Sequence, residues 1–128
     1  MKNLLARGTS RAILVAAGLV LGVAPAFAVG AIAVSNPGGL RADQIGYGVG
    51  HGESRDEAQR HAFKKCSRVG NTDCSVAVWY DTCGAYAASR DRYGYGYGSN
   101  ERIARSEALS HCANDHCAIV VSDCVDGH

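Results

Sequence analysis

The sequence YGVGHG at residues 47–52 returns as YGYGYG at residues 93–98, and this repetition decides the fold. The same spacing of 46 residues relates the small residues after the two stretches: Ala58, Ala62 and Cys66 correspond to Ala104, Ala108 and Cys112. Self-similarity at a fixed period is the signature of a repeated structural unit. We therefore predict two tandem repeats, over residues 31–83 and 85–124, with a pseudo-twofold relation.

Each quoted stretch alternates glycine with a larger residue. Alternate side chains of a strand point to opposite faces, so one face is bare backbone. The other face carries the side chains Tyr47, Val49, His51, Tyr93, Tyr95 and Tyr97. Glycine weakens a strand unless something must approach its backbone closely. We expect the alanine stripe of the next helix in each repeat to pack on this glycine face.

Helix signals come directly after each glycine stretch. Ser54 and Glu57 form a capping box, and Asn100 stands at the position equivalent to Ser54. Small residues then recur at i, i+4 up to Cys66 and Cys112, which predicts helices over 55–66 and 101–112.

Further strands complete a β-β-α-β unit in each repeat. We predict them at residues 31–35, 75–80, 85–89 and 118–122, with a longer first hairpin over residues 36–44. The expected class is α+β, with an antiparallel or mixed sheet and two helices in a single domain.

The first 28 residues have the composition of a secretory signal peptide. Lys2, Arg7 and Arg11 form a basic start, residues 12–24 are apolar, and Ala26-Phe27-Ala28 fits a cleavage site. The apolar part is shorter than the roughly 20 residues that a membrane-spanning helix needs. We expect cleavage near Ala28 and a secreted or periplasmic domain over residues 29–128, with no membrane span.

The charge of that domain argues against two classes of partner. Three of the 13 Lys and Arg residues lie in the leader, which leaves 10 against 12 Asp and Glu residues and a net charge of about −2. The remaining basic residues are scattered along the chain. Nucleic acids and anionic membranes attract clustered basic residues, so we expect neither as a partner.

All six cysteines lie after residue 28, three in each repeat. In an exported chain they are expected to form three disulfides. Because equivalent cysteines should have equivalent roles, the duplication favours one set of pairs. We predict bonds between Cys66 and Cys74, between Cys112 and Cys117, and between Cys83 and Cys124. In this interpretation Cys83 and Cys124 each close the third strand of a repeat and join the halves.

A zinc site is the alternative interpretation of the second repeat, where His111-Cys112 and His116-Cys117 place two His and two Cys within seven residues. Structural zinc sites use separated ligand pairs, and an oxidising compartment favours bonds between sulfurs. We therefore expect no metal and no other cofactor.

The motifs together resemble a known family. They are AIAVS at residues 31–35, GYGVG at 46–50, GYGYG at 94–98, the Ser-x-x-Glu-Ala helix ending in Cys, and CSVAVW at 74–79. In this order they are similar to the bacterial secreted family called domain of unknown function 4189, over residues 30–124. The resemblance implies export and a duplicated fold, and it supplies no activity and no catalytic residues. Residues 36–44 depart from the family pattern.

No recognised catalytic motif is present: the sequence lacks a nucleophile elbow, a zinc-protease helix motif and a P-loop. We expect no enzyme activity and no catalytic residues. The leading hypothesis is a small binding module that contacts a protein, peptide or glycan of the cell envelope. Its candidate contact face comprises Tyr47, His51, Tyr93, Tyr95 and Tyr97.

Other interpretations remain open. The tyrosine rings would be core residues if they pack against the other repeat. A periplasmic inhibitor or immunity-type protein is a special case of the binding role. A hydrolase of unfamiliar type would require a cleft that gathers His51 or His61 with a carboxylate.

Overall fold

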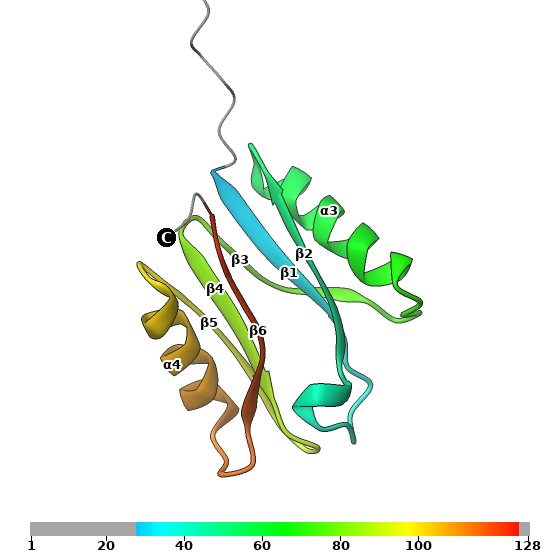
Figure 1. Cartoon of the computed structure of the whole chain (residues 1–128), viewed down its shortest axis with the longest axis vertical. Helices are drawn as coiled ribbons and strands as arrows, with labels where there is room; N and C mark the ends of the chain where they lie inside the picture. Colours follow the sequence, from blue (N-terminus) through cyan, green and yellow to red (C-terminus); the bar gives the residue numbers. More distant parts are fainter. Residues whose placement is uncertain (1–27, 126–128) are drawn as a thin grey trace, which may run out of the picture.

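The computed structural model describes residues 28–125 (Figure 1). The predicted signal peptide, apart from Ala28, lies outside the described residues. In chain order the elements are β1 (Val29–Ser35), the 3₁₀ helix η3 (Ala42–Gln44), β2 (Gly46–Gly52), α3 (Arg55–Arg68), β3 (Ser75–Tyr80), β4 (Cys83–Ala88), β5 (Tyr93–Gly98), α4 (Glu101–Cys112) and β6 (Ala118–Cys124).

The strands form two antiparallel sheets of three strands each, in the orders β2-β1-β3 and β5-β4-β6. In both sheets the first strand of the β-β-α-β unit, which is β1 or β4, lies in the middle. The register between the first and third strands shifts at Ile32/Ala33 in one sheet and at Tyr86/Ala87 in the other. The α+β class is confirmed, and the matching topology is consistent with the predicted tandem repeat.

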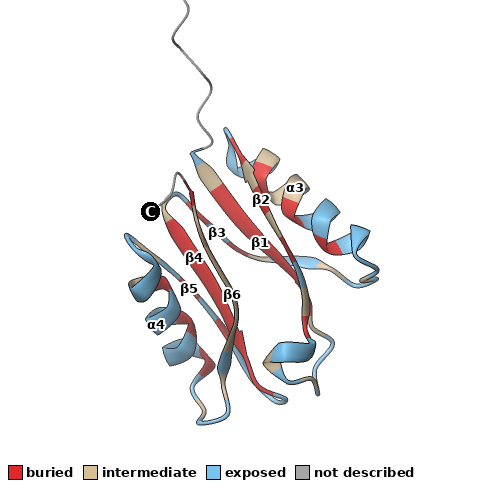
Figure 2. Ribbon diagram, in the orientation of Figure 1, coloured by how far each residue is buried: buried red, intermediate tan, exposed pale blue. Residues whose placement is uncertain are grey.

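The two sheets pack face to face, and one helix covers the outer side of each sheet (Figure 1). Ile32, Val78, Tyr80 and Tyr86 meet in the core between the sheets. Figure 2 shows each helix with its buried residues toward the sheet and its outer side exposed. The order of layers is therefore helix, sheet, sheet, helix.

Glycine allows each helix to lie directly on its edge strand. A Cβ atom added at Gly48 would lie 2.2 Å from the backbone nitrogen of Cys66, and one at Gly94 would lie 2.3 Å from that of Cys112. Ala58 and Ala62 of α3 are fully buried, as are Ala104 and Ala108 of α4. The predicted packing of glycine strands against alanine stripes is confirmed.

Both helices begin where the capping residues predict. Ser54 Oγ accepts a hydrogen bond from the Glu57 amide at 3.2 Å, and Asn100 Oδ1 accepts one from Ile103 at 2.9 Å. The Glu57 carboxylate reaches the amide of Glu53 rather than that of Ser54. α3 continues to Arg68, two residues beyond the predicted end.

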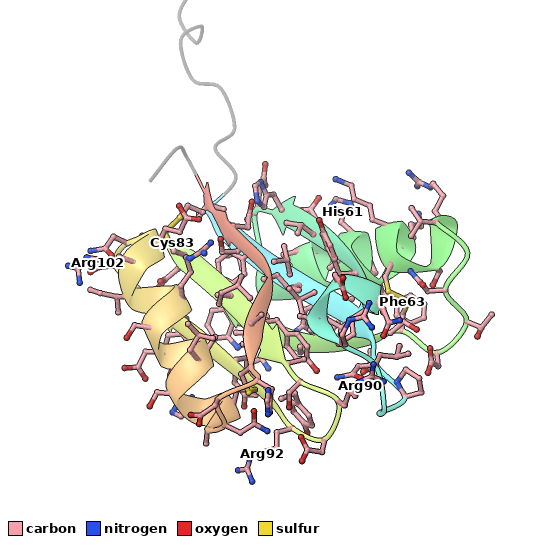
Figure 3. All side chains as sticks on the ribbon, turned by 60° about the horizontal axis from the view of Figure 1, so that its bottom comes forward. His61, Phe63, Cys83, Arg90, Arg92 and Arg102 are labelled. Atoms are coloured by element: carbon pink, nitrogen blue, oxygen red, sulfur yellow. A yellow bond between two sulfur atoms is a disulfide. The ribbon has the colours of Figure 1, made fainter. Side chains whose placement is uncertain are left out.

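The three disulfides join the predicted pairs: Cys66–Cys74, Cys83–Cys124 and Cys112–Cys117. One part of the interpretation is wrong. Cys83 is the first residue of β4 and lies opposite Cys124 of β6, so their bond lies within the second sheet and does not join the halves (Figure 3). Only Asp81 and Thr82 separate β3 from β4, and the strand restarts at Cys83.

Candidate functional site

The tyrosines of β5 form one exposed row. Tyr93, Tyr95 and Tyr97 are 61%, 44% and 64% exposed, because the intervening glycines turn the other face of β5 toward α4. Tyr93 also stacks on Tyr86, with ring centroids 5.9 Å apart. These three rings are not core residues. We call Tyr93, Tyr95 and Tyr97 the tyrosine row.

β3 runs beside the tyrosine row and adds exposed apolar side chains. Trp79 and Val76 of β3 are both more than a third exposed. The Arg55 guanidinium, at the start of α3, lies 4.9 Å from the centre of the Trp79 ring. This distance is within the range of a cation–π interaction.

Three cavities of about 290, 290 and 270 Å³ lie in line between β3 and the tyrosine row. The first two share Val76 and Tyr95, and the second and third share Trp79 and Tyr97. The shared residues make them one groove, which we call the β3–β5 groove.

The structure divides the candidate contact face between two edges of the sandwich. Tyr47 and His51 lie on β2, at the edge opposite β5. Tyr47 is 44% exposed there. The His51 ring turns toward β6 and does not contact the tyrosine row.

A polar cluster links the sheets at this second edge. His51 Nε2 and the Tyr80 hydroxyl each donate a hydrogen bond to Asp123 Oδ2, both at 2.7 Å. Burial, followed by the hydrogen bond to the Asp123 carboxylate, raises the pKa of Tyr80 far above its usual range, so the phenol stays a neutral donor. His61 contacts the carbonyl oxygen of His51 through Nδ1 at 2.8 Å.

This cluster borders a cavity of about 500 Å³ that is also lined by Val49, His61 and Lys65. In the sequence Asp123 is only one of several carboxylates near strand ends, and Tyr80 belongs to no predicted site. In the structure Tyr80 and Asp123 occupy the same register position, opposite Gly30 in one sheet and Gly84 in the other, and the sequence alone does not show this register.

A larger cavity than those above, about 1060 Å³, lies between the η3 segment and the start of β6. The amide of Gly39 donates to the carbonyl oxygen of Arg90 at 2.8 Å and holds residues 36–44 against the turn between β4 and β5. The cavity rim carries both signs of charge, from Arg41, Asp43 and Asp91 among others.

Comparison with known proteins places the chain in a family. The model of the family described as Domain of unknown function (DUF4189) matches residues 29–124. The chain belongs to the DUF4189 family. No curated protein and no solved structure matches it. The matched range of DUF4189 covers the strands β1 to β6 and the helices α3 and α4, so the tyrosine row and the Asp123 cluster both lie inside the family domain.

The zinc interpretation of this DUF4189 domain is wrong, because Cys112 and Cys117 are bonded to each other. His111 instead contacts the carbonyl oxygen of Tyr95 through Nδ1 at 2.9 Å. Between residues 28 and 125, no three His, Cys, Asp or Glu side chains gather as a metal site requires. No helix in that range has the length and apolar character to cross a membrane.

Proposed function

We propose that this protein is a small exported interaction module of the periplasm or cell envelope, which binds a protein, peptide or glycan through the tyrosine row. The exposure of three neighbouring rings on one strand carries this proposal. Tyrosine offers a large amphipathic contact area with little loss of side-chain entropy. An exposed aromatic patch on a small domain is typical of an interaction site.

The rigid support of the row favours the same role. β5 is fixed on one side by β4 and on its glycine face by α4, and Cys112–Cys117 closes the end of α4. A contact surface that is already ordered loses little conformational freedom on binding. The disulfides also suit an oxidising compartment outside the cytoplasm.

A second candidate, a hydrolase of unfamiliar type, is favoured by the His51–Asp123 pair beside a cavity. The contact between His51 Nε2 and Asp123 Oδ2 orients the imidazole ring beside this cavity, as a general base requires. However, the other side chains that line this cavity, Val49, His61 and Lys65, include no hydroxyl or thiol nucleophile. The interaction role therefore has the stronger support.

Site-specific photo-cross-linking in cells of the producing organism tests the interaction role. We expect a benzophenone side chain in place of Tyr97 to give a discrete cross-linked species, with at least about five times the yield obtained at Leu109. Leu109 is the matched control because it is 38% exposed on α4, away from the tyrosine row. Equal yields at the two positions would contradict the proposed surface.

A further inference from the structure

β3 has an open edge along the β3–β5 groove. It pairs only with β1, and among residues 28–125 no strand lies on its other side. An edge strand leaves a row of backbone N–H and C=O groups unpaired, and such a row is a template for another strand.

This edge forms the floor of the groove. Four consecutive residues, 76–79, line its middle cavity. Arg55 and Gln59 of α3 form one wall, and Tyr95 and Tyr97 of β5 form the other. The space is therefore bounded by a helix on one side and by aromatic rings on the other, with strand backbone between them.

At the equivalent edge of the other sheet, a side chain of the outer strand β6 is bonded to α4. Ser122 of β6 lies opposite Ala85, as Trp79 of β3 lies opposite Ala31, so the two residues are equivalent in the two sheets. Its hydroxyl donates to Glu101 Oε2 at 2.6 Å and accepts from Arg105 Nη1 at 3.3 Å, which links β6 to the start of α4. At β3, by contrast, Arg55 lies over Trp79 and has no ion-pair partner among the described residues.

We propose that the open edge of β3 binds an extended polypeptide segment of another protein as a fourth strand, between the tyrosine row and the start of α3. This inference rests on the proposed interaction role. Side chains on one face of a strand repeat every two residues, and the rings of the tyrosine row have the same repeat. Each ring therefore contacts one alternate side chain of the bound segment, as in other cases of strand addition.

Charge specifies the segment further. Arg55 places an unpaired cation beside the middle of the groove, while Asp73 and Asp81 line its two end cavities. The complementary segment carries an acidic side chain near its centre and basic side chains toward its ends. A second copy of this chain is a poorer occupant, because pairing two β3 edges brings two Arg55 cations to the same stretch.

Selection of phage-displayed random nonapeptides on the exported, oxidised protein provides the test. We expect selected peptides to carry a central Asp or Glu. Methylation of alternate backbone nitrogens should weaken their binding at least about tenfold, because it removes the amide donors that a fourth strand uses. Arg55→Gln should weaken binding about fivefold, whereas Arg102→Gln, on the exposed outer side of α4 (Figure 3), should leave it unchanged.

The experiment distinguishes a failure of strand addition at β3 from a failure of the interaction role. If Tyr95→Ser weakens peptide binding but backbone methylation does not, strand addition is overturned and the interaction role remains intact. If neither Tyr95→Ser nor methylation weakens peptide binding, or if the selection yields no binders, the result counts against both proposals. Light scattering tests for a dimer of the protein. A stable dimer whose formation Arg55→Gln strengthens would show that a second copy occupies the edge, and would also overturn the inference.

Discussion

Replacing Gly48 by alanine is expected to lower the free energy of unfolding by about 3 kcal/mol, as for an overpacked core site. The added methyl group would lie 2.2 Å from the backbone nitrogen of Cys66 and 2.5 Å from the carbonyl oxygen of Ala62. Both atoms belong to the α3 backbone, so no side-chain rotation relieves the overlap and the helix must move away from the sheet. Urea unfolding with the disulfides intact measures the loss.

Tyr47→Thr is the matched control for this experiment. Tyr47 is the neighbouring residue of the same strand, and its 44% exposed side chain points away from α3. We expect a loss of less than about 1 kcal/mol, because surface substitutions away from packed contacts have small effects. A similar loss for both variants would contradict the close packing of α3 on the glycine face.

Removing the Cys83–Cys124 bond is expected to have the largest effect of the three disulfides. Its cysteines are 41 residues apart in sequence, against 8 for Cys66–Cys74 and 5 for Cys112–Cys117. Because loop-closure entropy grows with loop length, the double alanine variant should lose about 4 kcal/mol of stability.

Removal of Cys112–Cys117 by double alanine substitution is the comparison, with an expected loss of about 2 kcal/mol. Cys83 and Cys112 are both fully buried, so the two variants remove similar side-chain packing. Thermal melts and urea unfolding of both variants give the order of the losses. The reverse order would show that chain closure is not the main source of disulfide stability here.

Local signals in the sequence were sufficient for most of the fold. The glycine alternation, the caps Ser54 and Asn100 and the 46-residue spacing predicted both helix starts, the packed faces and the disulfide pairs. The helix starts and the packed faces depend on neighbours within one unit, so a short stretch of sequence contains the information. The Cys83–Cys124 pair, 41 residues apart, was instead predicted from the equivalence of the two repeats.

The arrangement of one sheet on the other was not predictable in this way. Periodicity shows which face of β5 carries the tyrosines, but it does not show that β3 runs beside them or that β2 lies next to β6. Contacts between sheets depend on strand order and sheet twist, which no single segment encodes. For this reason the Tyr80–Asp123–His51 cluster and the separation of Tyr47 from Tyr95 emerged only from the structure.

The most direct test of the binding surface is an NMR map of the isotopically labelled, oxidised protein as unlabelled envelope extract of the producing organism is added. The proposed interaction role predicts changes in amide signals confined to β3, β5 and the first turn of α3. Changes centred on His51 and Asp123, or around the cavity beside η3, would instead place the functional site there and contradict the proposed role.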